Sequence, residues 1–251
     1  MTGEWVGDWR LGPGRLVLAG SFGSTSLHQH PALQITVALT GALIATDADE
    51  SRTCRAVLIP SGARHTLSPA DATTRALSIY LHPATVEAHR LAATTAESGV
   101  DEWISRAEPV TDLDLGDADS LDAMTETVLT TLSGQPTRAA ASPTLRDAFD
   151  LLTVLLPGKL YLRDLAGAVA LSPSSLSRLF ATETGVSFPT TVRLARLLHA
   201  MREIDAGRTI TDAAHTAGFT DSAHVTRVCR EMTGVPPSVL IGTARQSAAV
   251  D

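Results

Sequence analysis

The chain has 251 residues, enough for one large domain or two modest ones, each with a buried core. Hydrophobic residues make up 44% and charged residues 19% of it, which excludes extensive disorder. The two cysteines, Cys54 and Cys229, form no CxxC or CxxxC pair, which argues against a disulfide framework or a zinc finger. The sequence has neither a membrane-length apolar run nor a signal-peptide pattern, so we expect a cytoplasmic protein without a membrane partner.

The charge is divided unevenly along the chain, whose net charge is −7. Residues 157–251 hold ten basic and eight acidic side chains, whereas residues 1–156 hold ten basic and nineteen acidic ones. An acidic front and a mildly basic back suit a protein whose back half contacts nucleic acid. Ordinary scatter of surface charge explains so small an excess equally well.

The front of the chain has the period-two apolar spacing of β-strands. In residues 33–39, for example, Leu33, Ile35 and Val37 alternate with Gln34 and Thr36. Turn-forming residues separate the short candidates, which are Arg15–Ala19, Leu33–Leu39, Ala42–Thr46, Arg55–Ile59 and Ala76–Leu81. Several short strands at regular intervals predict a small barrel or sandwich.

Helical patterns replace the strand pattern after Pro83. The expected helices are Thr85–Ser98, Ser120–Leu132 and Thr144–Leu156, and the second has an apolar face of Leu121, Met124, Val128, Leu129 and Leu132. Ser133–Pro143 is small, polar and proline-containing, so it is expected to be a loop, and Pro157–Gly158 should end the third helix. These helices serve either as core or as a dimer face.

Residues 161–185 have the pattern of a helix-turn-helix. A first helix has apolar residues at i, i+3, i+4 and i+7, namely Leu162, Leu165, Ala166 and Val169. After a turn at Ala170–Ser172, Ser172 is a suitable N-cap and Pro173 a suitable first residue for a second helix. That helix should end at Gly185 and bury Leu176, Leu179 and Phe180.

The same arrangement recurs at residues 210–234. Its first helix buries Ile210, Ala213, Ala214 and Ala217, and its second buries Val225, Val228, Cys229 and Met232. Gly218–Phe219 lies in the turn, and Gly234 follows the second helix. The two units match at an offset of 48 residues through the first helix and 49 through the second. We therefore predict a duplicated helix-turn-helix whose second turn is one residue longer.

The two units are joined by a predicted helix over residues 190–204. At 1.5 Å per residue this helix is roughly 20 Å long, so one chain can present both second helices to major-groove faces about 34 Å apart. The segments LRDLAGAVALSPSSLSRLFATETGVSF, RLARLLHA and ITDAAHTAGFTDSAHVTRVCREMTGVPP resemble the AraC/XylS family of bacterial regulators over about residues 160–241. Val228–Cys229 departs from the family, which generally has an aromatic there, so a looser core is expected.

The family resemblance places DNA contacts on exposed residues early in each second helix. In the first unit these are Ser174, Ser175, Ser177 and Arg178, and in the second Ser222, Ala223, His224, Thr226 and Arg227. Both arginines should contribute most, because a guanidinium can bond guanine O6 and N7 together or clamp a phosphate. The short serines should read shape or phosphates more than bases. For any one residue, a solvated polar face is the alternative.

The front half carries two motifs that resemble those of the cupin barrel, over about residues 14–82. The first contains His28 and His30 as an HxH pair, and the second is the PxGxxH segment that ends at His65. In metal-binding cupins such histidines and a carboxylate four residues after the pair hold a divalent ion. This chain has Gln34 at the carboxylate position. Two interpretations stay open: a divalent metal site made of these four residues, and a metal-free effector pocket lined by the three histidines.

These features predict an α+β multidomain chain. Its parts are a cupin-like sensor barrel with a trailing helix (1–105), a helical linker or dimerisation segment (106–156) and an all-α double helix-turn-helix domain (157–251). The resemblance implies a homodimeric, non-enzymatic transcription regulator that binds double-stranded promoter DNA under a small-molecule or metal effector. An activator would also contact RNA polymerase. The rival function is a cupin dioxygenase or isomerase with an appended DNA-binding domain.

Overall fold

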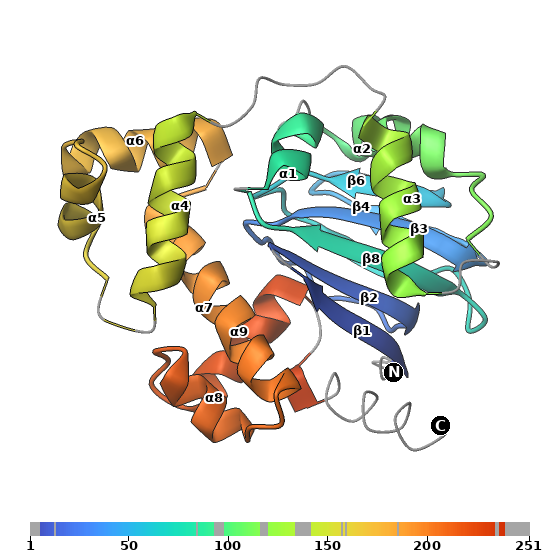
Figure 1. Cartoon of the computed structure of the whole chain (residues 1–251). Helices are drawn as coiled ribbons and strands as arrows, with labels where there is room; N and C mark the ends of the chain where they lie inside the picture. Colours follow the sequence, from blue (N-terminus) through green and yellow to red (C-terminus); the bar gives the residue numbers. More distant parts are fainter. Residues whose placement is uncertain are drawn as a thin grey trace.

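The structure, a computed structural model, has two lobes: a β-domain and a bundle of short helices (Figure 1). No helix in its described part combines the length and apolar character needed to cross a membrane. The described residues are 6–12, 14–83, 85–92, 98–115, 120–133, 142–156, 158, 160–184, 186–233 and 236–238.

The β-domain consists of two antiparallel sheets. A five-stranded sheet has the order β1-β2-β8-β3-β6, and a three-stranded sheet has the order β5-β4-β7. The strands are β1 (Val6–Gly12), β2 (Arg15–Ser21), β3 (Leu33–Thr40), β4 (Leu43–Thr46), β5 (Ser51–Cys54), β6 (Ala56–Ile59), β7 (Thr66–Pro69) and β8 (Arg75–Leu81).

All five strands expected from the sequence are present, and three others were missed. In β1 only Trp9 is buried, so this edge strand lacks an alternating apolar pattern. β5 and β7 have four residues each and are largely polar.

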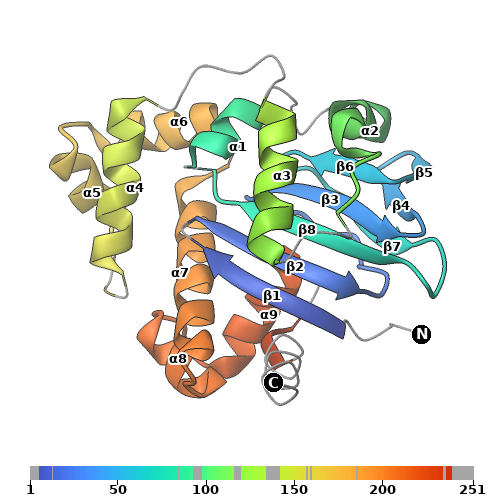
Figure 2. The same ribbon diagram turned by 45° about the vertical axis from the view of Figure 1, so that its right-hand side comes forward.

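The five-stranded sheet packs one face against helices α1 (Val86–Leu91) and α3 (Leu121–Ser133). As predicted, α3 directs one apolar stripe inward: Val128, Leu129 and Leu132 are buried, and Leu121 and Met124 are partly buried beside them. Alternate residues of β2, β3 and β8 supply the sheet side of this core. Figure 2 shows α3 lying across this sheet. Because strand side chains alternate, the opposite face of β3 carries Gln34 and Thr36.

Two elements precede α3 and were not expected from the sequence. They are α2 (Val100–Ala107) and the 3₁₀ turn η1 (Glu108–Val110). α2 packs on β6, and its buried Val100, Trp103 and Ala107 recur at helical spacing, so the sequence did contain the signal. The expected helix 85–98 is shorter in the structure, where α1 ends at Leu91, and residues 93–97 lie outside the described part.

The helical lobe follows the predicted order closely. Its helices are α4 (Pro143–Leu155), α5 (Leu162–Ala168), α6 (Pro173–Thr184), α7 (Phe188–Asp205), α8 (Ile210–Thr216) and α9 (Ser222–Thr233). The predicted fold class, a β-domain followed by an all-α domain, is thus confirmed. Within the expected segment 106–156, α3 packs on the sheet and α4 on α5 and α6. Residues 134–141 of the predicted loop, Pro157, Gly185 and Gly234 lie outside the described residues.

The two helix-turn-helix units are buried in different ways. The first has a core contributed by α4 to α7 and the segments that join them, without residues of the β-strands. The second shares a continuous core with the β-domain, in which α7, α8 and α9 pack against Trp9, Leu16, Leu18 and Tyr80. The Tyr80 hydroxyl also donates to the carbonyl of Thr233 at the end of α9, at 3.3 Å. The second unit is therefore docked on the β-domain.

Candidate DNA interface and histidine site

The first helix-turn-helix turns at a residue in the left-handed region. Ala170 has φ of +55°, and the chain reverses so that the Leu171 amide donates to the Ala166 carbonyl at 2.9 Å. Ser172 then caps α6, because its hydroxyl accepts from the Ser175 amide at 3.1 Å. The cap expected from the sequence is confirmed.

The second unit repeats this geometry. Gly218 has φ of +77°, and the Phe219 amide donates to the Ala214 carbonyl at 2.9 Å. Asp221 caps α9 by accepting from the His224 amide at 2.7 Å. The left-handed residues Ala170 and Gly218 are 48 positions apart, whereas the caps Ser172 and Asp221 are 49 apart. This confirms that the extra residue lies in the second turn, between the left-handed residue and the cap.

The four DNA-contact residues predicted on α6 are all exposed. Arg178 projects from the same half of the helix as the serines. The hydroxyls of Ser174 and Ser175 lie 3.0 Å and 2.8 Å from that of Ser172, so the cap holds both in place. This face is polar and accessible.

The five residues predicted on α9 divide into two groups. Ala223 and Arg227 are exposed, and the Arg227 side chain keeps 66% of its surface accessible. Ser222, His224 and Thr226 are half-buried. The His224 ring packs edge-on against Phe219 and lies 3.1 Å, at Nδ1, from the Thr220 hydroxyl. His224 therefore stabilises its own turn.

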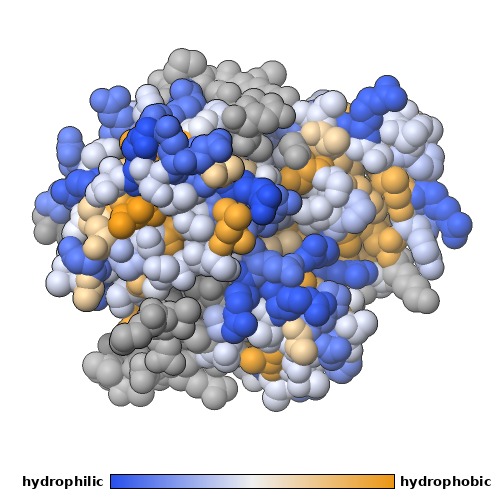
Figure 3. Space-filling view, turned by 180° about the vertical axis from the view of Figure 1, so that it is seen from behind, coloured by the Kyte–Doolittle hydropathy of each residue, from blue (hydrophilic) through white to orange (hydrophobic). Residues whose placement is uncertain are grey.

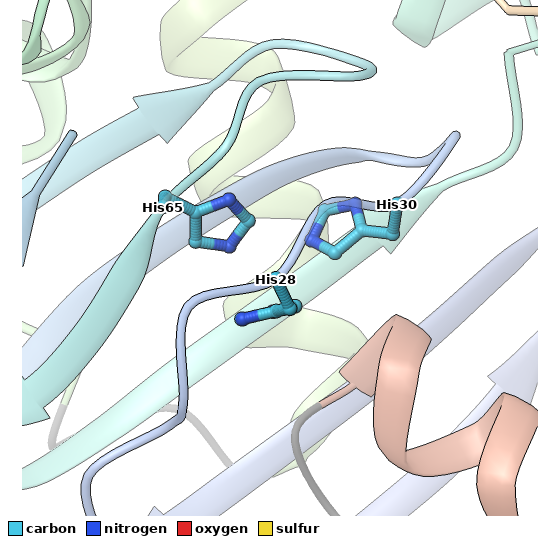
Figure 4. Close-up of side chains that lie close together, drawn as sticks. All are labelled: His28, His30 and His65. Atoms are coloured by element: carbon cyan, nitrogen blue, oxygen red, sulfur yellow. The ribbon is translucent and has the colours of Figure 1, made fainter. Parts of the chain in front are cut away.

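Three histidines meet at the edge of the β-domain (Figure 4). His28 and His65 pair as an isolated β-bridge, with amide-to-carbonyl distances of 3.0 Å and 2.9 Å, and His30 follows two residues after His28. The available ligand atoms of the three rings all lie within 4.8 Å of one another. The structure thus brings together the three histidines singled out in the sequence.

Each of these imidazoles is oriented by a backbone carbonyl. Nδ1 of His28, His30 and His65 lies 2.8 Å, 2.9 Å and 3.0 Å from the carbonyls of Ser26, Ala32 and Ala63. A neutral ring that donates from Nδ1 presents a lone pair at Nε2, as metal-binding histidines do. His65 Nε2 is buried and has no hydrogen-bond partner among the described atoms. These rings can hold a divalent metal ion through Nε2, provided that the Gln34 amide, whose Oε1 lies 2.9 Å from His30 Nε2, turns aside.

Burial keeps these rings neutral. It lowers the pKa of all three below the ordinary 6.5, to about 4 for His30, and repulsion between the rings lowers the pKa of His30 and His65 further. Gln34 is engaged elsewhere: its Oε1 lies 2.9 Å from His30 Nε2, and its Nε2 donates to Thr36 Oγ1 at 3.0 Å. The residue at the expected carboxylate position is therefore neutral and already hydrogen-bonded.

Comparison with known proteins agrees with this geometry. Residues 165–242 match the family model described as a helix-turn-helix domain, whereas no curated protein matches the sequence significantly. ToxT from Vibrio cholerae O395 is 11% identical, with 92% of this chain and 98% of ToxT covered and a TM-score of 0.58. Apo ToxT, a variant from strain SCE256, is 12% identical, with 93% and 99% covered and a TM-score of 0.60. Wild-type ToxT of that strain with bound unsaturated fatty acid is 13% identical, with 93% and 97% covered and a TM-score of 0.56.

The low identity to ToxT means that these structures establish the fold of both lobes and nothing further. The type of the helical lobe is identified by the family model, which matches residues 165–242, together with the duplicated turn. It is an AraC-type helix-turn-helix domain. The resemblance to the AraC/XylS family is therefore confirmed.

Two cavities lie between the β-domain and the AraC-type domain. The first, the histidine pocket, has a volume of about 490 Å³. On the β-domain side it is lined by residues 27–31 and Gly62. On the helical side it is lined by Val186, Ser187, Thr190, Arg193, Glu231 and Met232. The second, the recognition groove, has a volume of about 450 Å³ and is lined by Ser26, Leu27, His28, Ser222, Ala223, Thr226, Arg227, Arg230 and Glu231. Hydrophilic surface gathers where the two lobes of the molecule meet (Figure 3).

The recognition groove includes four of the five DNA contacts predicted on α9. In this structure the β-domain loop Ser26–His28 lies opposite them across the groove. Arg193 of α7 and Glu231 of α9 were not predicted as site residues; they form an ion pair, and Arg227 Nε lies 4.0 Å from Glu231 Oε1. Glu231 follows Arg227 by four residues, so the shared helix face was visible in the sequence.

Proposed function

We propose that this chain is a transcription regulator that binds promoter DNA through both units of its AraC-type domain and is controlled by an effector bound between its lobes. The observation that carries the proposal is the duplicated unit, with the same left-handed turn and the same cap before each second helix. Such a second helix enters the major groove, and two of them on one chain read adjacent segments.

The two second helices are proposed to read DNA differently. On α6, Ser174, Ser175 and Ser177 contact phosphates, while Arg178 reaches base edges. On α9, Arg227 is the principal base contact, and Ser222, Ala223 and Thr226 line the approach. His224 is proposed to act mainly through the turn, because it packs on Phe219.

The effector of the β-domain is proposed to be a divalent metal ion held by His28, His30 and His65. The three carbonyl-oriented rings and the buried, unpartnered Nε2 of His65 support this assignment. When bound, such an ion supplies an attachment point for a further anionic ligand. Gln34, the fourth residue predicted here, has its Oε1 2.9 Å from His30 Nε2, so its amide must turn away before that nitrogen can bind the ion.

A small organic acid is the second candidate effector. The two cavities gather Arg193, Arg227 and Arg230 around a single carboxylate, that of Glu231, so positive charge predominates there. One of the ToxT structures contains an unsaturated fatty acid. A volume of about 490 Å³ is within the range of small-molecule sites.

Homodimerisation through residues 106–156 and contact with RNA polymerase by an activator remain predictions. Either effector acts by linkage, since a ligand that favours one arrangement of the lobes changes promoter affinity by its coupling free energy. The rival, a cupin dioxygenase or isomerase, would show turnover by the metal-loaded protein.

Binding to the chain's own upstream promoter fragment tests the proposed function. Fluorescence anisotropy over a salt series should give tighter binding to the promoter than to a scrambled fragment at every salt concentration. Elemental analysis of the same preparation distinguishes the two effectors, because near-stoichiometric metal favours the ion and its absence favours the organic acid. Equal affinity for both fragments would contradict sequence-specific binding there.

A further inference from the structure

We propose that Glu231, on α9, supplies the carboxylate ligand that a metal ion at the three histidines would otherwise lack. A divalent ion held by His28, His30 and His65 would then join the two lobes and hold α9 away from DNA. This inference rests on the metal site of the proposed function and names the residue through which that site controls DNA binding.

Three imidazoles and a water can hold a zinc ion, but an anionic ligand would strengthen the binding of a divalent ion at the histidine site. Three neutral imidazoles contribute no negative charge, and His30 and His65 are 3% and 0% exposed. A double positive charge in such surroundings is costly unless an anionic group compensates it. Gln34 is neutral and hydrogen-bonded to His30 and Thr36, so it does not provide that charge. Carboxylate oxygen is a common partner of imidazole around zinc.

The site opens toward the helix that carries Glu231. His28 is the least buried of the three histidines, and it lines both the histidine pocket and the recognition groove. Glu231 also lines both cavities, and it is the only acidic residue among the described residues that line them. Figure 4 shows a helix in the red of the C-terminal part of the chain beside the three rings. The missing charge is thus provided from the opposite wall.

The present partners of Glu231 leave it available. It pairs with Arg193 and Arg227, and the three side chains are 47%, 46% and 66% exposed. Ion pairs this exposed to solvent contribute little to stability, so exchanging one for a metal ligand costs little. Rotation of a side chain on the surface of α9 requires no change in the helix itself.

Metal binding and DNA binding then exclude one another. With Glu231 held at the histidine site, Ser222, Thr226 and Arg227 stay opposite Ser26–His28 across the recognition groove. Its volume of about 450 Å³ accommodates a small molecule but not a duplex. A duplex therefore reaches the half-buried Ser222 and Thr226 only if α9 leaves the β-domain, although Arg227 is already exposed. By reciprocity, DNA must weaken metal binding by the factor by which metal weakens DNA binding.

Zinc titrations of the full-length protein test this inference. Calorimetry gives the Zn²⁺ affinity, and anisotropy of the labelled promoter fragment gives the DNA affinity with Zn²⁺ or with EDTA. We expect Glu231→Gln to lower the Zn²⁺ affinity at least about tenfold and to abolish the loss of promoter affinity that Zn²⁺ causes in the wild type. Arg193→Gln is the matched control: it breaks the same ion pair but keeps the carboxylate, so its Zn²⁺ affinity should equal or exceed that of the wild type.

A second variant separates ligand charge from lobe coupling. Gln34→Glu, added to Glu231→Gln, places a carboxylate on the β-domain, so it should restore Zn²⁺ affinity without restoring the effect of Zn²⁺ on DNA. Equal Zn²⁺ affinity in the wild type and Glu231→Gln overturns the role of Glu231 while leaving the histidine site in place. Absence of Zn²⁺ binding by the wild type overturns the metal site as well, and promoter binding still tests the regulator independently.

Discussion

The two helix-turn-helix units have the same local geometry but different cores. The first is closed by aromatic rings: Phe180 packs against Phe149 and Phe188, with centroid separations of 5.3 Å and 5.4 Å. At the equivalent position, 49 residues later, the second has Cys229, which is fully buried beside Thr233. Residues of the β-domain, including Trp9, complete that core. The hydrophobic core of the first unit thus contains no β-strand residue, whereas that of the second includes several.

The largest expected difference concerns these equivalent core positions. Phe180→Ala should lower the free energy of unfolding by about 3–5 kcal/mol, because it leaves a cavity beside Phe149 and Phe188 at a fully buried position. Cys229→Ala removes a single sulfur atom and should cost about 1 kcal/mol. Urea unfolding with linear extrapolation measures both. Similar costs at the two sites would show that the two cores are equally dependent on their central residue.

The DNA-binding arginines give the next contrast. In the presence of EDTA, Arg178→Ala and Arg227→Ala should each weaken promoter binding by about 1–3 kcal/mol if the guanidinium bonds a base. Competition with scrambled DNA is the control, since loss of a base contact affects the promoter selectively. A loss of equal size on scrambled DNA would reassign that arginine to a phosphate. Only Arg227 lines the recognition groove, so only its contribution should depend on the position of the β-domain.

The β-domain also reaches the first unit, at His82. Its ring lies edge-on to Phe149 of α4, with a centroid separation of 4.8 Å. Burial, and secondarily Arg202, lowers the pKa of His82 to about 4 from the ordinary 6.5. Below pH 6.5 the unfolded chain therefore takes up a proton that the folded chain does not, and the folded state loses stability until the pH reaches the folded pKa.

The consequence is measurable between pH 7 and pH 5. His82 should contribute a loss of about 1–2 kcal/mol in the free energy of unfolding over this interval. His82→Gln should reduce the decline by that amount, while the part due to His28, His30 and His65, whose pKa values are also lowered by burial, remains. Urea unfolding at several pH values provides the comparison. An unchanged decline in His82→Gln would show that His82 titrates normally in the folded protein.

The sequence predicted the helix-turn-helix units well because their signals are local. Apolar spacing and the caps are visible within a single helix and its ends, and the duplication is visible within residues 161–234. The strands β1, β5 and β7 were missed because Trp9 alone is buried in β1 and the other two are short and polar. Their pairing is set by neighbouring strands and not by their own composition.

The histidine cluster was also accessible from sequence, because the spacing of His28, His30 and His65 follows a known motif. The wall opposite them was not. Arg193 and Glu231 lie far along the chain, and only the docking of the second unit brings them to the same cavity as His28. That docking depends on long-range packing of α7 and α9 against Leu16, Leu18 and Tyr80, which no local pattern specifies.

The smallest contrast lies in the turns, where the left-handed position is Ala170 in the first unit and Gly218 in the second. An alanine in this conformation is strained by about 1–2 kcal/mol, whereas glycine adopts it readily but loses about 0.4–1 kcal/mol through greater freedom in the unfolded chain. Ala170→Gly should therefore raise the free energy of unfolding by up to about 1 kcal/mol, and Gly218→Ala should lower it by a similar amount. Thermal unfolding of both variants checks the opposite signs. A destabilised Ala170→Gly would mean that packing around the Ala170 methyl group outweighs the backbone strain, and the first unit would then owe its closed core to the turn as well as to Phe180.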